Sequence, residues 1–504
     1  MNEDTIAAIS TPIGTGGIGV IRVSGSEAVR LCDLLFEGKM HLSDAKSHTV
    51  HFGHIIENKD NIKCGALPEV SEENAGAADS SRFIIDEVLV SVFRAPHSYT
   101  TEDVVEIQSH GGIYVMQRIL ELLFEKGVRP AQAGEFTKRA FLGGRIDLSQ
   151  AESVMDIISA ENERILKNSQ RQLSGALSDS IAALRADILH EVAFIEAALD
   201  DPEHYDLDGY PGRLAGMVTA WRTQLERLLL SAGDGQLLKD GIRTVIIGKP
   251  NVGKSSLLNA LTKSDRAIVT DIPGTTRDVL EEKIRIRDIS LVIVDTAGIR
   301  ETDDTVEKIG IDRAISHAKN ADLILYVVDA SDALDDNDIR IIDSVDLAKT
   351  IVLLNKTDKA AVTSEETVLE AIRTVGESSN IYNSSSVIGE PSIPCTEQTV
   401  EILPISAKQQ TGLDVLYEKI SSMVFSGDVF SNDDIFITNL RHKSLLEQAE
   451  RSLSFVSTSI ADGQPEDFFS IDLMDAYTRL GEIIGQEVAD DLVEEIFSKF
   501  CMGK

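Results

Sequence analysis

The sequence predicts a multidomain protein that combines α/β units with a helical bundle. The first observation is an apolar run at 244–247, followed by a glycine-rich loop and a helical run at 256–261, the order that a P-loop requires. The second is a series of alternating, β-branched runs in the first part of the chain, typical of strands. The third is a pair of regions, 149–230 and 440–500, in which apolar residues recur at steps of three and four. A chain of 504 residues has room for about three domains of ordinary size.

The first 145 residues are expected to form an α/β region. Within it, residues 66–81 are rich in Glu, Ala, Ser and Gly, and we interpret them as a variable surface loop. The expected strands are 18–23, 50–56, 86–93 and 104–108, and the expected helices are 26–36 and 112–126.

From residue 149 the apolar period changes to that of helices. Apolar residues from 173 to 199 form one stripe, which predicts a single long helix that ends before Pro202. A second helix is expected over 213–230, and the glycines of 232–235 are expected to break it. Further helical stripes cover 445–460, 473–484 and 490–500. Because one-sided helices need partners, a single bundle with an inserted nucleotide-binding domain is favoured over two independent helical domains.

The glycine-rich loop has the chemistry of a phosphate site. Gly248 and Gly253 let the backbone curl so that N–H groups and the helix dipole face phosphate oxygens. Lys254 would reach the β- and γ-phosphates, and the Ser255 hydroxyl would coordinate Mg²⁺. The alternative is a chance glycine-rich turn. The residues expected to bind nucleotide here are Asn251, Val252, Gly253, Lys254, Ser255 and Ser256.

Three later motifs, each after an apolar strand, predict that the nucleotide is GTP and not ATP. The first, at residues 295–298, is expected to contact Mg²⁺ through water and to sense the γ-phosphate. In the second, the Asp358 carboxylate can accept hydrogen bonds from guanine N1–H and the 2-amino group, donors that adenine lacks. The third completes the base-binding rim. The motifs are Asp295-Thr296-Ala297-Gly298, Asn355-Lys356-Thr357-Asp358 and Ser406-Ala407-Lys408.

The first switch is expected in the polar segment Thr270-Asp271-Ile272-Pro273-Gly274-Thr275-Thr276-Arg277-Asp278. Thr276 is the candidate second Mg²⁺ ligand. Ile299 stands where a Ras-like enzyme has a water-orienting Gln, so hydrolysis needs another group, and a carboxylate of the acidic segment 301–307 is plausible. Asn251 could help to hold a monovalent cation or could simply cap the loop.

Charge and cysteine usage exclude several classes of protein. The excess of 83 acidic over 48 basic residues gives a net charge of −35, which argues against general electrostatic coating of nucleic acid but leaves a local basic groove open. The charge could equally serve solubility. Four scattered cysteines, an acidic start of the chain and the lack of an apolar run of about 18 residues predict a cytoplasmic protein without a signal peptide or membrane span.

The chain resembles the bacterial and organellar tRNA-modification GTPase family MnmE (TrmE) over nearly its whole length. Segments that carry the resemblance, besides the nucleotide motifs, are 4–8, 16–25, 106–112, 134–141, 145–152 and 501–504. The resemblance implies a tetrahydrofolate-binding and dimerisation domain at 1–145, like folate-dependent aminomethyltransferases. It further implies a discontinuous helical bundle at 146–238 and 429–504, and an inserted Ras-like P-loop GTPase domain at 239–428.

The resemblance also implies site residues. Arg22, Glu106, Arg145 and Lys504 would contact 5-formyl- or methylene-tetrahydrofolate, although relatives often have Lys at 145, whose geometry is not equivalent to that of Arg. From the residues alone, Arg22 and Glu106 could be solvated charges on strand faces. Cys501 would lie near the folate and take part in the modification, whereas an unremarkable thiol is the plain alternative.

Potassium activation is likewise implied by the resemblance. Asn251 would hold K⁺ with oxygens around Thr270, Ile272 and Thr275, although Pro273 stands where some relatives have Ala. Glu307 would orient the attacking water. The alternative is that Glu307 is only one more exposed charged residue in the acidic switch segment.

The family resemblance finally implies partners. A homodimer would form a heterotetramer with a flavoprotein, MnmG (GidA), and place an aminomethyl or carboxymethylaminomethyl group on C5 of the wobble uridine, position 34, of certain tRNAs. The rivals are a ribosome-assembly GTPase, which would need a basic RNA module that the sequence lacks, and a folate enzyme regulated by its GTPase domain.

Overall fold

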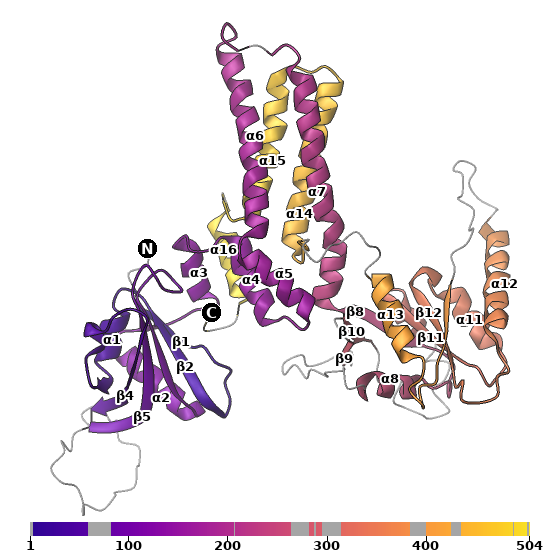
Figure 1. Ribbon diagram of the computed structural model, residues 1–504, viewed down its shortest axis with the longest axis horizontal. Helices are drawn as coiled ribbons and strands as arrows, with labels where there is room; N and C mark the ends of the chain where they lie inside the picture. Colours follow the sequence, from indigo (N-terminus) through magenta and orange to yellow (C-terminus); the bar gives the residue numbers. More distant parts are fainter. Residues whose placement is uncertain are drawn as a thin grey trace, which may run out of the picture. The chain divides into compact units, whose positions relative to one another are not determined.

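The computed structural model describes residues 4–58, 82–205, 207–263, 282–286, 289–294, 314–383, 400–424, 435–486, 488–500 and 503. The contacts of the chain divide it into two compact units, and Figure 1 labels its helices and strands. The first consists of Met1–Met155, Gln172–Ala193 and Tyr477–Lys504, and the second of Asp156–Arg171 and Phe194–Ala476. This division does not test the predicted three domains, which stay a prediction. None of the helices in the described ranges is long and apolar enough to cross a membrane.

The first unit is built on a mainly antiparallel sheet. Its described residues form seven strands in the order β3-β4-β5-β6-β2-β1-β7, of which β1 and β7 pair in parallel. Buried residues such as Ile21 and Ile107 pack against helices α1 and α2 on one face, and alternation leaves Arg22 and Glu106 on the other. The bounds are Ile6–Ile9 (β1), Gly16–Ser24 (β2), Ala28–Asp33 (α1), Phe36–Gly38 (β3), Thr49–Asn58 (β4), Arg82–Phe93 (β5), Val104–Gly111 (β6), Ile113–Glu125 (α2) and Arg129–Pro130 (β7).

The four strands predicted here are confirmed, but the helix predicted over 26–36 is wrong at its end. α1 stops at Asp33, and Phe36 instead pairs with Ile55 in the sheet. A Cβ on Gly53 would lie 2.6 Å from the Phe36 ring, so the glycine makes room for that ring beside the strand. Tertiary packing therefore overrides the apolar pattern that predicted a longer helix.

Helices α3 to α6 follow the sheet, with bounds Glu135–Leu142 (α3), Leu148–Ile158 (α4), Glu163–Leu173 (α5) and Ala176–Asp200 (α6). The single helix predicted over 173–199 is wrong at its start, because Leu173 ends α5 and Gly175, at φ 98°, separates it from α6. Near the carboxyl end of the chain, α16 (Asp490–Ser498) buries Val493 and Phe497 against Leu148 of α4.

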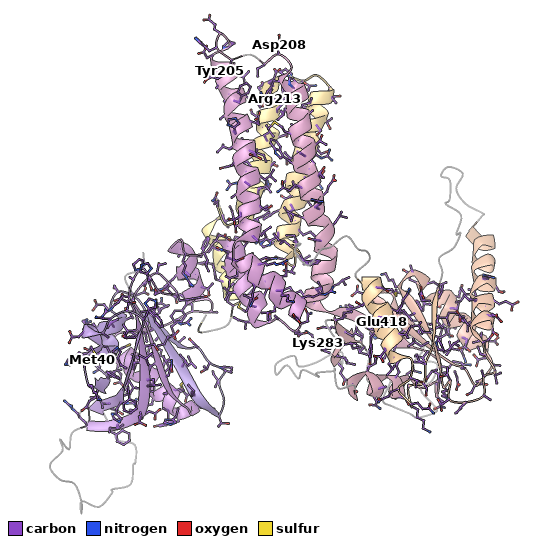
Figure 2. The ribbon with its side chains drawn as sticks, viewed as in Figure 1. Met40, Tyr205, Asp208, Arg213, Lys283 and Glu418 are labelled. Carbon is purple, nitrogen blue, oxygen red and sulfur yellow. The ribbon has the colours of Figure 1, made fainter. Side chains whose placement is uncertain are left out.

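In the second unit, helices from both sides of the P-loop segment pack together. α7 (Tyr210–Asp240) runs along α14 (Leu440–Ala461), and the pair is joined by an ion pair of 2.7 Å between Arg222 and Glu450. Helix α15 (Glu466–Ile483) follows α14. Figure 2 marks Tyr205 and Arg213 near the connection of α6 and α7.

The break predicted at 232–235 is wrong, since α7 continues through it to Asp240. A Cβ on Gly235 would lie 2.4 Å from the Ile437 carbonyl oxygen, so this glycine lets the chain before α14 approach the helix closely. The Ile437 N–H donates to Ser231 Oγ at 3.2 Å in the same contact. This packing offsets the usual cost of about 1 kcal/mol for glycine inside a helix.

The second sheet carries the nucleotide motifs. Its described residues form six strands in the order β13-β12-β11-β8-β10-β9, parallel except for the β9–β10 pair. One face packs against α8 and α13 and the other against α11 and α12, which explains why its central strands are continuously apolar. The bounds are Ile242–Ile247 (β8), Lys254–Lys263 (α8), Glu282–Ile286 (β9), Ile289–Ile293 (β10), Leu323–Asp329 (β11), Asp336–Ser344 (α11), Thr350–Asn355 (β12), Glu365–Asn383 (α12), Glu401–Pro404 (β13) and Leu413–Val424 (α13).

The strands predicted before each nucleotide motif are thus confirmed. The serine-rich segment 377–392 has a spacer loop as its default interpretation from sequence, and this is wrong in its first part, because α12 continues to Asn383. The rest of that segment lies outside the described residues, as does the loop predicted at 66–81.

Candidate functional site

The P-loop connects β8 to α8 and has the backbone that phosphate binding requires. Gly248, Asn251 and Gly253 have φ values of 154°, 61° and 104°. Lys254 Nζ donates to the carbonyl oxygens of Gly248 at 2.8 Å and Lys249 at 2.7 Å. The lysine thus binds carbonyls of its own loop, and the N–H groups at the start of α8 are those that bind anions in such loops.

Asn355 joins the three nucleotide motifs that the structure describes. Its Nδ2 donates to the Val252 carbonyl at 2.7 Å, and its Oδ1 accepts from the Ala407 N–H at 2.9 Å. The side chain is buried, and a Cβ on Gly253 would lie 2.2 Å from Nδ2. Asn355 therefore brings the P-loop, residues 355–358 and residues 406–408 next to one another, and their role in nucleotide binding stays a prediction.

Lys356 reaches back to the same loop. At φ 67°, it places Nζ 2.5 Å from the Asn251 carbonyl and 2.6 Å from Asp329 Oδ2. Burial alone would raise the pKa of Asp329, but hydrogen bonds from Lys356 and Ser331 outweigh it and lower the pKa. Sequence reasoning missed Asp329; the signal was an Asp ending the apolar strand β11, in register with Asn355.

Ser406 holds the carboxylate of Asp358 in place. Ser406 Oγ donates to Asp358 Oδ1 at 2.7 Å, and Thr357 Oγ1 donates to the Ile405 carbonyl at 3.0 Å. The Ser406 hydrogen bond, helped by the charge of Lys408, lowers the pKa of Asp358. The group is therefore an ionised acceptor at neutral pH, as a guanine-binding carboxylate must be.

Much of the remaining nucleotide site lies outside the described residues. Ser255 and Ser256 stand in the first turn of α8, and the Asn251 and Lys408 side chains are exposed. The predicted site residues outside the described ranges are Thr270, Asp271, Ile272, Pro273, Gly274, Thr275, Thr276, Asp295, Thr296, Ala297, Gly298, Ile299, Glu307, Cys501 and Lys504.

In the first unit, the structure brings the three described folate candidates together. Arg22 and Glu106 are cross-strand partners, with Nη2–Oε1 and Nε–Oε1 distances of 2.8 and 2.9 Å. The guanidinium carbons of Arg22 and Arg145 each lie 4.9 Å from the centre of the Tyr99 ring. Arg145 Nη1 also donates to the Tyr99 carbonyl at 2.8 Å. Sequence reasoning missed Tyr99, because nothing local connects it to residues 22 and 145.

The carboxyl end of the chain lies beside this cluster's strands. The Ser10 hydroxyl donates to the Gly503 carbonyl at 3.0 Å, and a Cβ on Gly503 would lie 2.3 Å from the Ile9 carbonyl oxygen. Ile9 ends β1, the strand paired with β2, which carries Arg22.

A buried ion network fixes helix α3 to the start of the chain. Arg139 Nη2 contacts Asp4 at 2.9 Å and Glu135 at 3.1 Å, and Arg129 Nε contacts Asp4 at 2.7 Å. Arg139 Nη1 also contacts Glu102 at 3.1 Å. Glu135 and Arg139 belong to the segment 134–141 of the family resemblance, and their described contacts are structural.

Comparison with known proteins agrees with the geometry. Residues 148–501 match the model of the MnmE helical domain, and residues 5–145 match that of the GTP-binding protein TrmE N-terminus. The tRNA modification GTPase MnmE of Lachnoclostridium phytofermentans is 45% identical over 507 residues, 100% of both chains. The corresponding protein of Bacillus subtilis is 41% identical, over 99% of this chain and 100% of the relative, and that of Listeria welshimeri is 43% identical over 100% of both. With most of its length matched in this way, the chain belongs to the MnmE family.

Proposed function

We propose that this protein hydrolyses GTP to GDP and phosphate in the modification of tRNA. The observation that carries the GTP assignment is the contact of Asn355 with both the P-loop and the base-binding rim, beside an ionised Asp358. The role in tRNA modification follows from membership of a family whose curated relatives are named tRNA modification GTPases. Lys254 would bind the β- and γ-phosphates, and Asp358 would select guanine.

Two metal ions are proposed for this site, Mg²⁺ from the GTPase activity and K⁺ from the family resemblance. Ser255, in the first turn of α8, would hold Mg²⁺ together with Thr276, and the ion would offset phosphate charge. Asn251 has a positive φ and an exposed side chain, which suits a cation ligand at the loop surface. With oxygens of Thr270, Ile272 and Thr275 it would hold K⁺. Glu307 would orient the attacking water, because Ile299 cannot.

The group formed by Arg22, Glu106, Arg145 and Tyr99 suits the binding of a tetrahydrofolate. Arg22 Nη1 is buried, and it finds no hydrogen-bond partner among the residues that the structure describes. Such an orphaned donor costs free energy unless a ligand pairs with it. Arg22, Glu106, Arg145 and Lys504 would bind 5-formyl- or methylene-tetrahydrofolate, which supplies a one-carbon unit when bound. The position of Gly503 supports a place for Cys501 near this ligand.

The proposed tRNA modification also requires partner proteins. A homodimer, joined through residues 1–145, would act with a flavoprotein such as MnmG in a heterotetramer in the cytoplasm. Together they would attach an aminomethyl or carboxymethylaminomethyl group to C5 of uridine 34. The helical bundle at 146–238 and 429–504 would carry the GTPase domain at 239–428 and transmit its opening and closing.

Two experiments test this proposal. Nucleoside analysis of tRNA after deletion of the gene should show loss of the modified wobble uridine, restored by the wild-type gene. An unchanged nucleoside profile would overturn the modification role. GTP turnover should be faster in K⁺ than in Na⁺ at equal ionic strength and should fall in Glu307→Ala. Equal rates in the two salts would remove potassium activation while leaving the GTPase assignment intact.

A further inference from the structure

Lys249, the second residue of the P-loop, is an anchored lysine that phosphate binding does not use. Its Nζ lies 2.7 Å from Asp338 Oδ2 and 3.2 Å from Asp335 Oδ2, and it also donates to the Ala333 carbonyl at 3.4 Å. The residue is 8% exposed. Its side chain therefore ties the P-loop to the beginning of α11, a helix that packs on one face of the sheet (Figure 1).

Asp338 is built into that helix start as a fixed partner. It is fully buried, and its Oδ1 accepts from the Tyr326 hydroxyl at 2.9 Å while Oδ2 accepts from the Asp335 N–H at 3.0 Å. Asp335 in turn caps the helix by accepting from the N–H groups of Asn337 and Asp338. A buried carboxylate with two neutral donors still needs a counter-charge, which Lys249 supplies.

The charged form of Lys249 is favoured by its acidic neighbours. Burial alone would lower the pKa of Lys249, but its hydrogen bonds to Asp338 and Asp335 outweigh burial and raise the pKa. Lys249 of the P-loop, Tyr326 of β11, and Asp335 and Asp338 at the start of α11 thus form one small cluster.

The loop's other contacts show why this anchor matters for nucleotide. The carbonyls of Gly248 and Lys249 accept from Lys254, and those of Asn251 and Val252 accept from Lys356 and Asn355. These bonds fix carbonyl positions in a loop with three positive φ angles. Lys254, Lys356 and Asn355 belong to the nucleotide motifs, whereas Asp335 and Asp338, the acidic partners of Lys249, lie outside those motifs.

We propose that Lys249 is a positioning residue that holds the P-loop in its phosphate-binding form through its ion pair with Asp338. This inference rests on the proposed GTPase function and deepens it. Because the effect acts on the loop that cradles phosphates, it changes the affinity for phosphates more than the affinity for the guanine base. The segment from Asp329 to Asp338 therefore supports the site at two points, through Lys356 and through Lys249.

The test compares the affinities of GDP and GMP for the full-length protein, measured by competition against a fluorescent GDP analogue. Lys249→Met should lower the ratio of GDP to GMP affinity by about 10-fold, equivalent to about 1.4 kcal/mol. Lys249→Arg, which keeps the charge, should recover most of that loss. Asp338→Asn should reproduce the loss, and the double variant should lose no more than either single variant, since one interaction is removed in each case.

Lys419→Met is the matched control, because Lys419 pairs with Glu401 in the same sheet unit, away from the P-loop. It should leave the affinity ratio unchanged. If Lys249→Met lowers thermal stability but leaves the ratio at its wild-type value, Lys249 only stabilises the fold and the inference is overturned. Failure of the wild-type protein to bind either nucleotide would instead overturn the proposed function itself.

Discussion

Replacing Gly253 by alanine should destabilise the GTPase unit through Asn355. The new Cβ would lie 2.2 Å from Asn355 Nδ2, closer than any real contact allows, and φ at this position is 104°. Asn355 would have to move, leaving the Val252 carbonyl and the Ala407 N–H without their buried partner. Losing these two bonds costs about 2–6 kcal/mol, and a non-glycine residue at positive φ adds about 1–2 kcal/mol.

A loss of this size is large beside the total stability of about 5–15 kcal/mol that is usual for a domain. Differential scanning calorimetry of the full-length protein, with and without GDP, identifies the relevant transition as the one that GDP raises. That transition should fall by at least about 6 °C, because about 1 kcal/mol shifts the melting temperature of a domain of this size by about 2–4 °C.

Gly376 provides a control for the same substitution. It is exposed in α12, and no described atom lies within 4 Å of where its Cβ would be. Gly376→Ala should therefore raise the same transition slightly, since alanine is favoured over glycine in a helix by about 0.5–1 kcal/mol. If Gly253→Ala melted within about 2 °C of the wild type, less than the shift from about 1 kcal/mol, the coupling of the P-loop to Asn355 would be refuted.

Three further predictions concern charge and ligand recognition. Burial would raise the pKa of Glu135, but hydrogen bonds from Arg129 and other groups outweigh burial and lower this pKa below the ordinary 4.5. The stability that the Glu135 carboxylate contributes is therefore present above pH 4.5 and is lost as the pH falls through the lowered pKa. Glu135→Gln should flatten the acid side of the stability profile measured by thermal melts, and an unchanged profile would contradict this. Asp358→Asn should weaken GTP binding by about 10–100-fold and favour xanthosine triphosphate, measured by competition; unchanged selectivity would contradict the base-recognition role. Tyr99→Ala should weaken tetrahydrofolate binding, measured by calorimetry, while Tyr99→Phe should not, because the aromatic ring is the part that packs on Arg22. If Tyr99→Ala bound tetrahydrofolate as tightly as the wild type, Tyr99 would not contribute to the site.

Local patterns predicted the second sheet well because its central strands are bounded by motifs. The apolar run before Asn355 is buried on both faces, so its strand needs no alternation to be recognised. The same reasoning failed where a distant contact decides the backbone. The helix through Gly235 survives because Ile437 packs against it, and α1 stops early because Phe36 joins the sheet.

The amino-acid sequence by itself determined the order and chemistry of the nucleotide motifs and the helical regions on either side. These depend on residue types and spacings within a few turns of chain. Only the tertiary structure decided that Tyr99 contacts both Arg22 and Arg145, that Gly503 returns to Ser10, and which partners secure the P-loop. Such contacts join positions far apart in sequence, so they are set by the order of strands in the sheets and by which buried charges find a counter-charge.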